Sequence, residues 1–158
     1  MKDIEDDAGL RYGDAGLPED LEGLPGAMIE AAIDEATAWV VVDEDDAPFG
    51  FALCWVRPGA LHLRELDVVR AAMGRGYGRA LVEHVAAEAR ARGLSHVTLT
   101  TFRDVEWNAP YYARRGLTIV EPRDQPPWLA AIRREEDEGE LAAWPRVAMR
   151  RATADRPA

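Results

Sequence analysis

The sequence predicts an α+β fold in which one mixed, mostly antiparallel sheet of about six strands is flanked by helices on both faces. Three short segments rich in β-branched and aromatic residues come first, and alternating helical and extended segments follow them. Early hairpins favour antiparallel pairing, and the later alternation favours helices packed against the sheet. With no repeat and no linker-like tract, residues 1–158 are expected to form a single domain.

The spacing of apolar residues and the turn residues between them define each element. In chain order we expect a helix over 24–33, strands over 37–42, 49–56 and 61–69, a helix over 79–92, a strand over 97–102, a helix over 108–115, a strand over 117–120, a helix over 128–137 and a strand over 145–150. The charged residues 133–138 are interpreted as a solvated helical face with i,i+4 pairs. Alternatively, the insert 121–144 covers a substrate site.

Composition narrows the class of protein. The net charge of −10 disfavours nonspecific nucleic-acid binding, and the chain has no apolar run long enough to span a membrane, so we expect a cytoplasmic protein. Residues 1–50 hold 15 acidic and 2 basic residues, whereas the remainder holds 14 and 17. The acidic residues 1–50 would attract a cationic substrate, or they serve solubility alone.

The cysteine content limits covalent and metal chemistry. A single cysteine, Cys54, excludes internal disulfides and Cys-rich metal sites, and we expect no metal.

A glycine-rich turn lies between the predicted strand 61–69 and the helix 79–92. It reads Met73-Gly74-Arg75-Gly76-Tyr77-Gly78-Arg79. Alternate glycines let backbone N–H groups approach a ligand without interference from Cβ atoms, and the following helix adds the partial positive charge of its N-terminus. The turn therefore predicts a diphosphate site, with Arg75 and Arg79 in contact with phosphate oxygens.

Other readings of this turn remain. The glycines also suit a tight strand-to-helix connection in which they serve close packing. A dinucleotide fingerprint is disfavoured, because it would need glycine at Leu81 or at Arg79. A P-loop is excluded, because Lys2 is the only lysine and that loop uses a lysine to reach the phosphates.

A second motif follows the predicted strand 97–102. It contains Asn108, Tyr112 and then Gly116-Leu117. In this order and at this spacing, the two motifs resemble those of the GNAT acyl-CoA transferase superfamily, whose loop reads roughly R/Q-x-x-G-x-G/A and whose later motif reads roughly N-x-x-x-Y-x-x-x-G-F. The resemblance runs from about residue 37 to residue 150.

The resemblance implies the fold, the co-substrate and the site. It implies a sheet splayed in its middle, with the pantetheine of acetyl-CoA lying between strands 61–69 and 97–102 as a pseudo-strand. The residues expected to bind acetyl-CoA are Leu66, Val68, Met73, Gly74, Arg75, Gly76, Tyr77, Gly78, Arg79, Asn108 and Tyr112. Two departures stand out: Met73 replaces the usual Arg or Gln, and the first strand is missing or displaced.

The implied reaction is direct transfer of an acetyl group from acetyl-CoA to a primary amine. Tyr112 is the candidate acid for the departing thiolate, since a phenol has a pKa near 10, or it packs between helix and sheet. His62 and Glu65, on opposite faces of one strand, are the candidate bases; a structural role for His62 is equally expected. The oxyanion would be held by backbone N–H groups near Leu66 and Val68.

A second reading from a different class is a catalytically inactive acyl-CoA-binding or sensing module on the same fold. Met73 and the short N-terminal region motivate it. The sequence leaves the acceptor open: it is a small-molecule or peptide amine, with cationic amines among the candidates. The oligomeric state is open as well, and a homodimer is one option.

Overall fold

The computed structural model describes residues 1–17, 23–139 and 141–153. The chain divides into two compact units. The first unit consists of Met1–Val56 and Leu63–Val85, and the second of Arg57–His62 and Ala86–Ala158.

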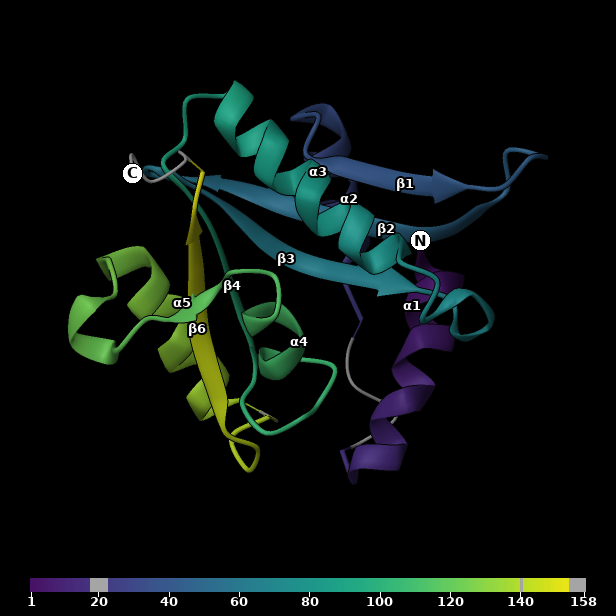
Figure 1. The fold of residues 1–158 in the computed structure, drawn as a ribbon. Coiled ribbons are helices and arrows are strands. Elements are labelled where there is room, and N and C mark those ends of the chain that lie inside the picture. The colour runs from purple at the N-terminus through teal and green to yellow at the C-terminus, as the bar shows by residue number, and fades with distance from the viewer. Residues whose placement is uncertain (18–22, 140, 154–158) are drawn as a thin grey trace. The chain divides into compact units, whose positions relative to one another are not determined.

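The elements of the described chain are drawn in Figure 1. The α-helices are α1 (Lys2–Gly9), α2 (Gly26–Asp34), α3 (Tyr77–Ala91), α4 (Ala109–Ala113) and α5 (Pro127–Glu138). The strands are β1 (Ala38–Val42), β2 (Pro48–Arg57), β3 (Ala60–Val68), β4 (His96–Phe102), β5 (Thr118–Ile119) and β6 (Arg146–Ala152). Three short 3₁₀ helices are η1 (Leu10–Ala15), η2 (Arg70–Ala72) and η3 (Pro122–Asp124).

The six strands form one sheet with the order β1-β2-β3-β4-β6-β5. The pairs β1·β2, β4·β6 and β5·β6 are antiparallel. This confirms the predicted fold class, a mixed sheet of six strands flanked by helices. The splay of the sheet and the single-domain assignment involve both units and stay predictions.

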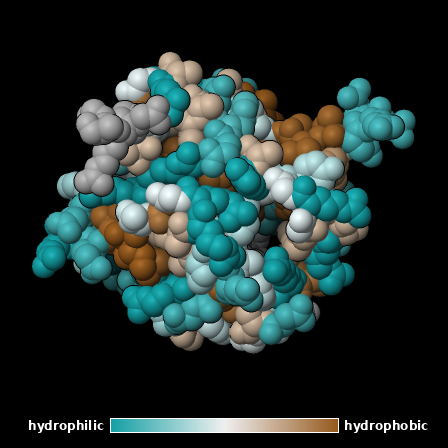
Figure 2. Space-filling view, viewed as in Figure 1, coloured by the Kyte–Doolittle hydropathy of each residue, from teal (hydrophilic) through white to brown (hydrophobic). Residues whose placement is uncertain are grey.

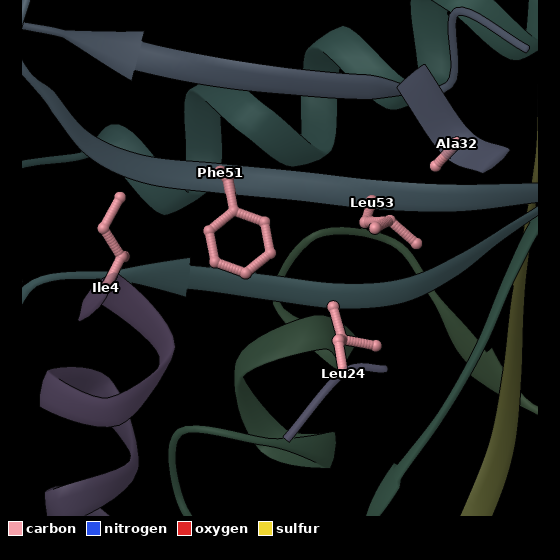
Figure 3. Packing of buried hydrophobic residues seen from close by; sticks show 5 residues of the cluster. All are labelled: Ile4, Leu24, Ala32, Phe51 and Leu53. Atoms are coloured by element: carbon pink, nitrogen blue, oxygen red, sulfur yellow. The ribbon is translucent and has the colours of Figure 1, made fainter. Parts of the chain in front are cut away.

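The first unit is built on the β1–β2 hairpin and the N-terminal helices. Its core cluster joins Ile4 of α1, Ala32 of α2, Phe51 and Leu53 of β2, and Leu24. Figure 3 shows Ile4 and Leu24 directed toward the β2 side chains. Burial of this apolar surface supplies the main driving force for packing α1 on the hairpin.

Helix α1 is absent from the elements expected from sequence. Its two buried residues, Ile4 and Ala8, are one helical turn apart, which is too short a pattern to predict a helix. Its N-cap, Met1, makes no side-chain capping bond. Packing in the tertiary structure, rather than local preference, therefore stabilises this helix.

The second unit is built on β4 and β6, which pair from His96↔Ala152 to Phe102↔Arg146. Helix α5 packs against β6, and its Leu129 is fully buried with Val120 and Ala148. Figure 1 shows α5 behind β6.

The interpretation of residues 133–138 as a solvated face needs correction. The pair Arg133–Asp137 exists at i,i+4 spacing. However, the side chains of Arg133 and Glu136 are only 11% and 17% exposed. Glu136 accepts hydrogen bonds from Thr100 of β4 and Arg146 of β6. This part of α5 is thus held to the sheet by buried polar contacts.

Large apolar side chains also lie on the surface. The most exposed are Leu10, Ile33, Val40, Val42, Val56 and Ile119. On the face drawn in Figure 2, hydrophilic residues predominate and apolar ones form separate small patches. Among the described residues, no helix has the length and apolarity needed to cross a membrane.

Candidate functional site

The glycine loop, residues 73–79, has the backbone conformation that its glycines predict. Gly74 and Gly76 have φ values of 76° and 93°, a region that other residues adopt only with strain. A Cβ atom built on either glycine would meet no heavy atom within 4 Å. Close packing therefore does not explain these two glycines, and the space beside them is open to a ligand.

The loop presents a run of unused backbone donors. Within the described part of the chain, none of the N–H groups from Gly74 to Arg79 donates a hydrogen bond to a protein acceptor. The first backbone bond of α3 runs from the N–H of Ala80 to the carbonyl of Gly76, at 3.0 Å. Successive open N–H groups at the start of a helix, here one of 15 residues, are an arrangement with which proteins bind anions.

The side chains of the loop add positive charge. Arg75 and Arg79 are exposed, and among the described residues neither forms an ion pair. Tyr77 is half-buried, and its ring packs edge-on against Phe49 at 4.7 Å between centroids. Tyr77 thus anchors the loop to β2, while the two arginines stay available to a phosphate.

Strand β3 leads to this loop and carries acidic side chains. Val68 is buried, and Leu66 and Glu65 are half-buried. Glu65 Oε2 lies 3.5 Å from Nη1 of Arg64. Burial, followed by the charges of Glu65 and Glu5, raises the pKa of Asp67 well above its ordinary value. The charges of two glutamates of the first unit therefore act on the carboxyl group of Asp67.

Asn108 of the second unit has an unused buried donor. Its side chain is 6% exposed. The hydroxyl of Thr101 donates to Asn108 Oδ1 at 2.6 Å, whereas Asn108 Nδ2 has no hydrogen-bond partner among the described residues. Since unpaired buried amides are costly, this N–H₂ group fits a site that a ligand completes.

Tyr112 lies on α4 one turn after Asn108. Its N–H donates to the carbonyl of Asn108 at 3.0 Å, and its half-buried ring contacts that of Tyr111 edge-on at 5.2 Å. Arg115 stacks over the Tyr111 ring at 3.3 Å from its centroid and donates to the Tyr111 carbonyl at 2.7 Å. Burial raises the pKa of Tyr111 against the opposing charge of Arg115. Tyr111 is therefore a packed residue.

His62 lies inside the second unit. It is fully buried. Its Nδ1 is 3.1 Å from the hydroxyl of Thr98, and its ring meets that of Trp128 edge-on at 5.6 Å. These contacts favour the structural role for His62 over that of a base open to solvent.

The predicted site residues thus form two groups. The glycine loop and Glu65, Leu66 and Val68 belong to the first unit, whereas His62, Asn108 and Tyr112 belong to the second. Two residues that contact predicted site residues were not predicted from the sequence. Thr101 orients Asn108, and its only signal was its place in the predicted strand that precedes the second motif. Arg11 contacts Met73, and its only signal was being one of two bases in residues 1–50.

The loop thus places open N–H donors at the start of α3, an arrangement that suits an anionic ligand. Residues 3–117 match the family model described as acetyltransferase (GNAT) family. The chain belongs to this family. The resemblance stated from the two motifs is thereby confirmed.

Solved structures share the fold at low sequence identity. N-acetylglutamate synthase from Neisseria gonorrhoeae, complexed with coenzyme A and N-acetyl-glutamate, matches 94% of this chain at 16% identity with a TM-score of 0.71. This chain spans only 32% of the length of that protein. Ard1 from Thermoplasma volcanium matches 98% of this chain and 93% of its own at 17% identity, with a TM-score of 0.69. Naa20 from Chaetomium thermophilum, in complex with a bisubstrate analogue, matches 83% and 74% at 16% identity, with a TM-score of 0.63.

Proposed function

We propose that this protein moves the acetyl group of acetyl-CoA to a primary amine by direct transfer, without an acyl-enzyme. One observation carries the proposal: the N–H groups from Gly74 to Arg79 have no protein acceptor among the described residues. A diphosphate supplies the anionic oxygens that such a run of donors requires. The family membership and the neighbour that contains coenzyme A support the same co-substrate.

The residues of each unit fit parts of acetyl-CoA. In the first unit, the loop backbone would hold the diphosphate, with Arg75 and Arg79 as additional cations. The N–H groups of Leu66 and Val68 would pair with the pantetheine and the acetyl carbonyl. In the second unit, the unpaired Nδ2 of Asn108 would donate to the coenzyme. These assignments follow the family motif residue by residue.

The chemistry requires one new bond and one broken bond. The neutral amine nitrogen attacks the thioester carbon, a C–N bond forms, and the C–S bond breaks to release the coenzyme A thiolate. Tyr112 would donate its phenolic proton to that sulfur, and the ammonium proton would leave to a base. Glu65 is the better candidate base, because it is half-buried on the strand next to the loop, whereas the His62 ring is fully buried against Trp128.

The acidic side chains of the first unit support a cationic acceptor. The charges of Glu65 and Glu5 both act on the carboxyl group of Asp67 in the first unit. An ammonium group placed among them would relieve their mutual repulsion. We therefore propose polyamines, aminoglycosides and basic peptides as the first acceptors to assay, with amino acids as the comparison class.

The test is acetyl-CoA turnover followed by free thiol release with this panel of amines. Tyr112→Phe is expected to lower kcat by roughly a hundredfold or more and to leave the Kd for acetyl-CoA within a few-fold, because the lost proton acts only in the transition state.

Tyr111→Phe is the matched control, since it removes the same hydroxyl from the adjacent packed ring, and kcat should change little. An unchanged kcat in Tyr112→Phe would remove Tyr112 from the acid role. Tight acetyl-CoA binding with no turnover on any amine would instead support the sensing module, and no binding at all would exclude both functions.

A further inference from the structure

Strand β1 lies at one end of the sheet, so one of its edges faces no other strand among the described residues (Figure 1). The N–H of Cys54 donates to the carbonyl of Thr37 at 2.9 Å, and these residues continue the register that pairs Ala38 with Leu53. Backbone groups of an antiparallel strand point alternately toward and away from its partner, so those of Ala38 and Val40 point away from β2. The edge therefore presents open backbone donors and acceptors.

The side chains of β1 carry no charge that would protect this edge. Natural edge strands are commonly protected by lysine, by proline or by other charged residues, whereas β1 reads Ala-Trp-Val-Val-Val. Val40 and Val42 are 48% and 41% exposed. Figure 2 shows an apolar patch where Figure 1 draws β1, beside the hydrophilic turn that follows it. A strand added here would cover Val40, whose cross-strand neighbour Phe51 is already fully buried.

Acidic residues flank both ends of β1. Asp34 and Glu35 precede the strand, and residues 43–46, which follow it, are all exposed Asp or Glu. Residues 12–56 contain no Lys, Arg or His. In the described part of the chain, Asp34 and residues 43–46 form no ion pair. Negative charge at both ends of the edge is complementary to an extended chain with basic residues at matching positions.

The same charges disfavour a second copy of this chain on the edge. In an antiparallel pair of two β1 strands centred on Val40, residues 43–46 of each copy would lie near Asp34 and Glu35 of the other. Like charges at opposing positions destabilise strand pairing.

We infer that the open edge of β1 binds an extended basic peptide, which joins the sheet as an additional strand. The backbone groups of Ala38 and Val40 would form main-chain hydrogen bonds, and the flanking acids would pair with Lys or Arg of the peptide. The five residues of β1 span about 17 Å, so the basic residues of the peptide are expected on either side of a centre of about five residues. The surface does not include the glycine loop, so the inference goes beyond the proposed function and does not depend on acetyl-CoA.

The probe is a synthetic peptide with a five-residue centre of alternating Thr and Val and two arginines at each end. Its Kd is measured by calorimetry. Glu44→Gln combined with Asp46→Asn should raise the Kd roughly fivefold, because two acids that would meet the arginines lose their charge. Asp14→Asn combined with Asp104→Asn removes two exposed charges from η1 and from the turn after β4, and this control should stay within about twofold.

Backbone pairing has a separate test. Val40→Pro removes one outward N–H and leaves the hydrogen bonds to β2 in place, so it should raise the Kd roughly tenfold. Val40→Thr keeps that N–H and a similar shape, and it should stay within about threefold. In the unmodified protein, the peptide should slow hydrogen exchange at Ala38 and Val40 and leave Trp39, whose N–H points toward β2, unchanged.

Each contrary result has one meaning. Absence of peptide binding, equal losses in the two charge variants, or unchanged exchange at Ala38 and Val40 would overturn the inference. Tighter binding of a peptide with glutamates in place of the arginines would do the same. Sedimentation velocity that shows a dimer of the unmodified chain, lost in Val40→Pro, would assign the edge to a second copy instead. Failure of the proposed function is seen separately, as absence of acetyl-CoA binding and thiol release without the peptide.

Discussion

Asp67 shows how a single half-buried carboxyl group can oppose folding at neutral pH. Burial, with the neighbouring charges of Glu65 and Glu5, raises its pKa well above the ordinary value of 3.8. The folded chain therefore holds this proton more tightly than the unfolded chain does. The stability that Asp67 contributes is fully present below its unfolded-state pKa and is lost as pH rises through its folded-state pKa.

We expect Asp67→Asn to be more stable than the unmodified chain at pH 8, because the amide needs no proton to stay neutral. The stability difference should shrink as pH falls toward 4. Each kcal/mol gained corresponds to a rise in Tm of roughly 2–4 °C for a chain of this size. Urea denaturation at a series of pH values measures the difference directly.

Asp45→Asn, in the exposed turn between β1 and β2, is the control for removal of one negative charge. A stability difference for Asp67→Asn that does not grow with pH would contradict the assignment of a raised pKa to this carboxyl group.

Helix α5 is joined to the sheet by a cluster of largely buried polar side chains around Glu136. Glu136 accepts from Thr100 at 2.5 Å, from Arg146 at 3.1 Å and from Arg133 at 2.5 Å. Burial alone would raise the pKa of Glu136, but Arg146, Thr100 and Arg133 together outweigh it and hold the pKa below its ordinary value. The cluster joins α5 to β4 and β6 through contacts 10 and 36 residues apart in the chain.

Glu136→Gln should destabilise the protein by roughly 2–4 kcal/mol at pH 7, because it removes the acidic partner of the largely buried Arg146 and one of the two acidic partners of Arg133. Glu135→Gln, at the exposed neighbouring position, should change stability by less than about 0.5 kcal/mol. Equilibrium unfolding in urea compares the two variants.

The pH dependence provides a second check. Since the pKa of Glu136 is lowered in the folded state, its contribution is present above the ordinary value of 4.5 and is lost as pH falls through the folded-state pKa. The cost of Glu136→Gln should therefore diminish in acid. A cost that is the same at pH 7 and pH 3 would show that charge is not the cause.

At the level of the whole protein, binding of acetyl-CoA should appear as a gain in thermal stability. A ligand at 100 times its Kd stabilises the folded state by about 2.7 kcal/mol, which corresponds to a rise in Tm of roughly 5–10 °C. Gly76→Ala should lose most of this rise, because its Cβ atom enters the open space beside the loop donors.

Gly16→Ala is a matched control for this measurement. Gly16 also has a positive φ, 74°, and also has open space around a built Cβ. Both substitutions therefore carry a similar backbone cost, roughly 1–2 kcal/mol, in the absence of ligand. Only Gly76→Ala should reduce the acetyl-CoA-dependent rise in Tm, and equal reductions would indicate that backbone strain, not ligand contact, is being measured.

Local sequence patterns were sufficient to predict many of the helices and strands of this protein. The helix from Tyr77 to Ala91 and the strands on either side were predicted within a few residues, because their apolar periodicity and bounding glycines act over short sequence distances. Alternate glycines in residues 74–78 likewise predict open N–H groups, since the freedom of a glycine depends on its own backbone. The order and spacing of the Asn108 and Tyr112 motif identified the family.

Contacts between distant residues could be found only in the folded chain. Arg11 and Met73 are 62 positions apart, and Thr100 and Glu136 are 36 apart, so no local pattern relates them. Helix α1 forms because Ile4 packs on Phe51 and Leu53. Burial of His62 and the raised pKa of Asp67 depend on which side chains surround each group. Backbone conformation and amphipathic faces follow from neighbours along the chain, whereas charge pairing and burial follow from neighbours in space.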